Sequence, residues 1–197
     1  MPTSETSLCN RALQMIGAGR IQTITDPGSA AARACNSLYA EIRDEVMAVH
    51  EWQFAKARQV LAQLSSGPPF GYEYAYQLPS ECLRPLRLHN ELEIGREIEW
   101  EVEGDELYCD LESDVQLHYI KRITDTSKFS PMFKSSFCTR LSSDLAMILK
   151  KDAKLQKSQL DIYYKLLPSQ SATDARSENQ PLPNHNPELG IFARARS

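Results

Sequence analysis

The chain lacks any uninterrupted apolar run long enough to span a membrane, and its first residues lack the cationic and apolar regions of a secretory signal. Its five cysteines are an odd number with no CxxC pair, which argues against a disulfide framework or a zinc site and favours reduced, buried thiols in a cytoplasm. The motifs GxSxG, GxxxxGK[ST] and HExxH are also absent. We therefore expect no membrane anchor, no metal, no cofactor and no catalytic residue.

Charge is nearly balanced over the 197 residues, with 22 Lys and Arg against 26 Asp and Glu, which argues against a dedicated nucleic-acid binder. Locally it is uneven. Residues 90–114 hold eleven acidic residues and one cation, Arg96, whereas residues 121–167 hold ten Lys and Arg against four Asp. An acidic and a basic segment in one chain predict complementary surfaces that meet between copies of the protein.

Three stretches place apolar residues at steps of three and four, the spacing of one helix face. They predict helices over about 5–17, 27–50 and 131–166. The third stretch contains no internal proline or glycine, so the pattern predicts one long helix that packs against more than its own domain.

Between about 72 and 122 the period changes to two, as in strands with one wet and one buried face. Gly104-Asp105 fits a tight hairpin, and the connections are too short for helical crossovers, so the sheet is expected to be antiparallel. The predicted fold is α+β, a helical bundle with one long C-terminal helix plus a small antiparallel β-sheet, in a domain of residues 1–167.

Residues 168–197 form a separate region of composition, polar and rich in proline, and predict a flexible, extended C-terminal arm. The last residues of the arm differ in composition from the rest of it. An apolar cluster followed by two cations is typical of a docking peptide, so we predict partner-binding residues at Leu189, Ile191, Phe192, Arg194 and Arg196.

Two further functions stay open at this point. A carboxylate such as Glu99 or Glu101 could serve a peptidoglycan hydrolase, although alternating glutamates on one strand are typical of a solvated face. The basic stretch 131–166 could serve a DNA-binding packaging factor, although its lysines are spaced around a helix.

Four stretches occur in a fixed order: LCNRALQMIGAGRIQTITD, AEIRDEVMAVHEWQFAKAR, YEYAYQLPSECLRPLRL and LHYIKRITDTSKFSPMF. With them, the sequence from about Leu8 to Leu166 resembles the tail tubular protein A family, the head-to-tail adaptors of short-tailed bacteriophages. The most specific pieces are HEWQFA at 50–55, YAYQLP at 74–79, and Thr124-Asp125 with FSP at 129–131. They read as core aromatics and turns, so the resemblance is one of scaffold.

The resemblance implies a structural protein of the virion, assembled in the cytoplasm of the bacterial host. Twelve copies would form a ring beneath the portal protein, with the tail nozzle protein below, and double-stranded genomic DNA would pass through the lumen without sequence-specific binding. In that setting the arm would dock on the portal, and the acidic segment 90–114 and the basic helix 131–166 would lie at subunit contacts.

Overall fold

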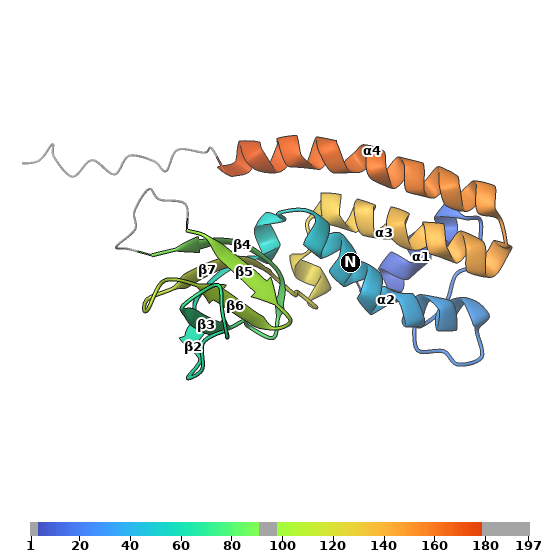
Figure 1. Cartoon of the computed structure of the whole chain (residues 1–197). Helices are drawn as coiled ribbons and strands as arrows, with labels where there is room; N and C mark the ends of the chain where they lie inside the picture. The colour runs from blue at the N-terminus through green and yellow to red at the C-terminus, as the bar shows by residue number, and fades with distance from the viewer. Residues whose placement is uncertain (1–3, 91–97, 179–197) are drawn as a thin grey trace, which may run out of the picture.

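The chain folds into a helical unit and a two-sheet β unit that lie side by side (Figure 1). The computed structural model describes residues 4–90 and 98–178. Its helices are α1 (Glu5–Met15), α2 (Ala30–Val49), α3 (Pro131–Leu145) and α4 (Ala153–Glu178), with short turns η1 (Gln53–Ala55), η3 (Thr126–Lys128) and the π-helical η4 (Ala146–Lys150). Its strands are β1 (Lys56–Val60), β2 (Ala62–Gln63), β3 (Tyr74–Gln77), β4 (Cys82–His89), β5 (Trp100–Glu103), β6 (Glu106–Cys109) and β7 (Gln116–Lys121).

Serine side chains begin the first three helices. Ser4, Ser29 and Ser130 each accept a hydrogen bond from a backbone N–H of the first turn, which satisfies a donor that the helix itself leaves open. The Asp26 carboxylate accepts from the Gly28 N–H at 2.9 Å in the preceding turn. Helix α2 therefore begins at Ala30 and not at the expected position 27.

The prediction of one long C-terminal helix over 131–166 is wrong. Helix α3 ends at Leu145, the chain passes through η4, and α4 folds back along α3 (Figure 1). Lys151 reverses the chain in a left-handed conformation with φ of 52°. The Asp152 carboxylate then starts α4 by accepting from the N–H groups of Lys154 and Leu155, both at 3.0 Å. Helices α3 and α4 are antiparallel and bury apolar faces against each other. The spacing of apolar residues along this stretch is therefore the same as in one continuous helix.

Helix α4 also changes the predicted arm. Residues 168–178, expected to be flexible, continue the helix to Glu178. The rest of the predicted arm lies outside the described residues.

Lys151 provides a test of the helix reversal. A residue other than glycine in the left-handed conformation strains the folded state by about 1–2 kcal/mol. Glycine removes this strain, but it loses more backbone entropy on folding, which offsets part of the gain. We expect Lys151→Gly to raise the free energy of unfolding by about 0.5–1 kcal/mol in urea titrations. Lys154→Gly, inside α4, should instead lower it by about 1 kcal/mol. If Lys151→Gly destabilises the protein as Lys154→Gly does, the chain does not reverse at this residue.

The prediction of a single small sheet is also wrong, because the strands form two sheets. Sheet A has the order β1-β7-β4 and sheet B the order β2-β3-β6-β5, with every pairing antiparallel. Strands β1 and β2 precede the predicted region 72–122. The sequence KARQV of β1 shows little apolar alternation, since three of its five residues are exposed.

The two sheets stack on a shared core. Leu117 and Tyr119 of β7 and Tyr76, Leu107 and Cys109 of sheet B are buried together between them. The next residue of β7, Ile120, points to the opposite face and joins the core of the helical unit. The outer face of sheet A is thus covered by helices near Ile120 and lies open at its other end. All five cysteines are free thiols, four of them buried and Cys82 half-buried.

Candidate interaction surfaces

Cations gather on the outer face of sheet A. The register places Arg58 of β1 opposite His118 of β7, and His118 opposite Arg87 of β4. In the next row Gln116 stands opposite His89. The open part of this face is a surface that we call the basic sheet face: Arg58, Arg87, His89 and His118. Lys56 and Arg84 share the row of Ile120 beneath the helices, where Lys56 pairs with Glu51 at 3.2 Å.

The open end of the basic sheet face is hollowed. The hollow measures about 410 Å³, and the described residues that line it are Arg58, Arg87, His89, Gln116, Leu117 and His118, none of which is acidic. Among the residues that the structure describes, no carboxylate forms an ion pair with Arg58 or Arg87. Burial and then the charges of Arg58, Arg87 and Lys56 lower the pKa of His118, against a smaller opposing effect of Glu51. The hollow is therefore a region of positive potential.

Carboxylates gather on the outer face of sheet B. Glu99, Glu101 and Glu103 alternate with inward-facing residues along the edge strand β5, and Glu106 of β6 stands directly opposite Glu103. We call these four residues the acidic strand face. The Tyr108 hydroxyl donates to Glu106 Oε2 at 2.9 Å, and this bond, burial and the charges of Glu106, Glu103 and Asp105 raise the pKa of Tyr108. The potential here is negative.

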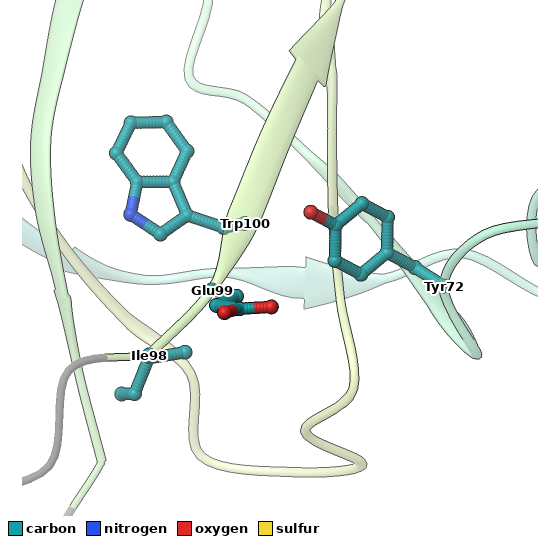
Figure 2. Close-up of a pocket in the computed structure, with 4 residues that line it drawn as sticks. All are labelled: Tyr72, Ile98, Glu99 and Trp100. Atoms are coloured by element: carbon teal, nitrogen blue, oxygen red, sulfur yellow. The ribbon is translucent and has the colours of Figure 1, made fainter.

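One end of the acidic strand face borders an open pocket of about 390 Å³ lined by Tyr72, Ile98, Glu99 and Trp100. In Figure 2 the rings of Trp100 and Tyr72 lie on opposite sides of β5. Burial and then the charges of Glu101, Glu99 and Asp110 raise the pKa of Tyr72. Of the two carboxylates that the hydrolase alternative invokes, Glu99 lines this pocket and Glu101 does not.

Several cations of the predicted basic segment 121–167 are engaged within the chain. Arg140 pairs with Glu45 and Asp144, both at 2.8 Å, and Arg122 pairs with Asp44 at 2.7 Å. A further open cationic surface comes from sheet A, and no pattern in the sequence predicts it. Its arginines come from strands far apart in the sequence, and only the register brings them together.

The predicted docking residues Leu189, Ile191, Phe192, Arg194 and Arg196 lie outside the described residues. In residues 4–90 and 98–178, no group of three or more His, Cys, Asp or Glu side chains is placed to hold a metal ion. Within the same part of the chain, none of the helices combines the length and the apolar character of a membrane span.

The motifs that carry the family resemblance pack the interior. The Trp52 indole donates from Nε1 to the Val46 carbonyl at 2.9 Å, and its ring meets Phe133 edge-on with the centroids 5.3 Å apart. Asn10 bonds the buried Ile21 through both amide atoms. Tyr76 lies in the core between the sheets. These residues hold the scaffold together.

A scan against protein-family models finds no match for this chain. A search of curated proteins finds no significantly similar sequence.

Proposed function

We propose that this chain is the subunit of a ring-shaped head-to-tail adaptor of a short-tailed bacteriophage, a structural protein of the virion that acts through its surfaces and not through catalysis. The ring of twelve copies joins the portal protein to the tail nozzle protein, and genomic DNA passes through its lumen. The ordered motifs between Leu8 and Leu166 support this proposal through the family resemblance.

The observation that carries the proposal is the arrangement of charge on the β unit. One sandwich presents the basic sheet face on one outer side and the acidic strand face on the other. Broad charged faces suit protein partners, since electrostatic complementarity sets the register and the choice of partner. Two different faces on one subunit also suit a cyclic assembly.

The second contact of the proposed adaptor is with the portal. We assign it to the C-terminal residues Leu189, Ile191, Phe192, Arg194 and Arg196, where an apolar anchor stands beside two cations. Twelve such segments around a ring would add their modest individual affinities into avidity.

Deletion of residues 179–197 tests this assignment without cutting any described element. We expect the shortened protein to keep its thermal unfolding midpoint and to lose firm attachment to portal rings of the same phage in co-sedimentation. Electron microscopy of the full chain with those portals should show a ring beneath each portal.

A matched control keeps the length of the chain and replaces only Leu189, Ile191 and Phe192 by serine; it should behave as the deletion does. Undiminished attachment by both variants would overturn the portal role of these residues. Absence of any ring on portals with the full chain would overturn the adaptor function.

A further inference from the structure

We propose that the acidic strand face of one copy of this chain seats on the basic sheet face of the next copy, so that the subunits associate head to tail. The inference deepens the proposed function by naming the subunit contact of the ring. It requires only self-association, so it can fail while portal attachment holds.

The two surfaces cannot pair within one chain. They lie on the outer faces of sheets A and B, and the inner faces of the same sheets are packed together around Leu117, Tyr119 and Leu107. The strands stand between them. Within the described part of the chain, no carboxylate pairs with Arg58 or Arg87, and a second copy supplies both surfaces in equal number.

Each surface concentrates one sign of charge. Arg58 and Arg87 flank His118 in one cross-strand row on sheet A, and Glu103 stands directly opposite Glu106 on sheet B. Like charges directly opposite each other destabilise a sheet. Seating the glutamates on the guanidinium groups relieves the repulsion between Glu103 and Glu106 and neutralises both arginines, which favours association over the separate subunits.

Both surfaces present accessible charged groups. Strand β5 is at the edge of sheet B, and its Glu101 and Glu103 side chains are exposed. The exposed Arg58 and Arg87 line the hollow of about 410 Å³ on sheet A. Guanidinium groups bind carboxylates through paired, charge-assisted hydrogen bonds, so each arginine can hold one incoming glutamate.

The contact joins two different patches and is therefore heterologous. A heterologous contact repeats from copy to copy and closes into a ring when the rotation allows it. A twofold contact would need both surfaces of one subunit to face the same partner, which their positions on opposite outer faces of the sandwich prevent. The charge pattern thus favours rings over dimers.

The contact should respond to pH through His118 of the hollow. In the free subunit His118 faces Arg58, Lys56 and Arg87, with Glu51 beyond Lys56 and His89 in the next row, and its pKa lies below 6.5. Carboxylates seated beside it raise that pKa. The associated form then binds more protons than the free form, so association should strengthen as the pH falls below neutral.

Charge reversal tests the contact by sedimentation velocity. A basic-face variant carries Arg58→Glu and Arg87→Glu, and an acidic-face variant carries Glu101→Lys and Glu103→Lys. Each alone should sediment as a 22.3 kDa monomer, with association weakened by about a hundredfold or more. An equimolar mixture should restore the large species, because each reversed surface then meets an opposite one.

A third variant reverses Lys154 and Lys157, which are exposed on α4 in the basic stretch that the sequence predicts at subunit contacts. It should associate as the unchanged protein does; if it is monomeric while the basic-face variant associates, the contact lies on α4 and the proposal is wrong. Circular dichroism melts of all variants show whether they remain folded, which is expected at exposed positions. The proposal is also overturned if the basic-face or the acidic-face variant alone still associates fully, or if the mixture stays monomeric.

Binding of a short DNA duplex tests whether nucleic acid, and not a second copy of the chain, occupies the basic sheet face. If the duplex binds the unchanged protein, and the basic-face variant loses this binding but keeps self-association, the surface serves nucleic acid and the proposal is wrong. A full chain that stays monomeric at every concentration also overturns it. Portal attachment, measured separately, then decides the adaptor function.

Discussion

Replacing Phe133 by alanine is expected to lower the free energy of unfolding by about 3–5 kcal/mol. The Phe133 ring is fully buried at the centre of an aromatic cluster. Its centroid lies 4.7 Å from that of Phe129, 5.2 Å from Phe54 and 5.3 Å from Trp52. The substitution removes a large apolar surface and leaves a cavity that rings fixed on two separate segments cannot close.

The cluster also joins the two units of the fold, which is why the loss should be felt everywhere. Phe133 belongs to α3, whereas Trp52 and Phe54 lie in the segment that leads from α2 into sheet A. Urea denaturation followed by circular dichroism measures the effect. Phe70→Ala is the matched control, because Phe70 is 85% exposed and its removal should change stability by less than about 0.5 kcal/mol. A loss below about 1 kcal/mol for Phe133→Ala would mean that the cluster is not packed as described.

Local signals in the sequence predicted the parts of the fold that are determined locally. Ser130-Pro131 combines a capping hydroxyl with a proline that loses no hydrogen bond at the first helical position, and α3 begins there. Gly104 has a φ of 62° in the hairpin between β5 and β6, as the Gly104-Asp105 pair predicts. Such features depend on neighbours within four residues.

The helix reversal after Leu145 depends on more distant partners. The Ser142 hydroxyl donates to Gln159 Oε1 at 3.0 Å inside the contact between α3 and α4. Apolar spacing is the same whether the second stretch continues the helix or folds back on it. Asp152 offers a local signal for a new helix, since its carboxylate can accept from the N–H groups of the first turn.

The two charged surfaces also differ in whether local sequence predicts them. The acidic strand face was readable because Glu99, Glu101 and Glu103 alternate on one strand, and alternate positions share a face. The basic sheet face was not, because Arg58, Arg87 and His118 come from three strands. Their meeting requires the register of β1, β7 and β4, which no local pattern specifies.

Asn10 stabilises the fold through buried hydrogen bonds, and its replacement should also lower the free energy of unfolding strongly. The side chain is buried on α1. Its Nδ2 donates to the Ile21 carbonyl at 2.9 Å, and its Oδ1 accepts from the Ile21 N–H at 2.8 Å. This pair of bonds fixes the chain after α1 against the helix in a part of the backbone that has no strand partner.

Asn10→Leu keeps a similar volume but leaves the buried Ile21 N–H and carbonyl without partners. Each unsatisfied buried group costs about 1–3 kcal/mol, so we expect a loss of about 2–4 kcal/mol in urea titrations. Gln14→Leu, on an exposed position of the same helix, should change stability by less than about 0.5 kcal/mol. Hydrogen exchange gives a sharper readout, because the Ile21 amide should lose its protection in Asn10→Leu and keep it in Gln14→Leu. An Ile21 amide that stays protected in Asn10→Leu would show that another group holds this turn, and the predicted loss would then not follow.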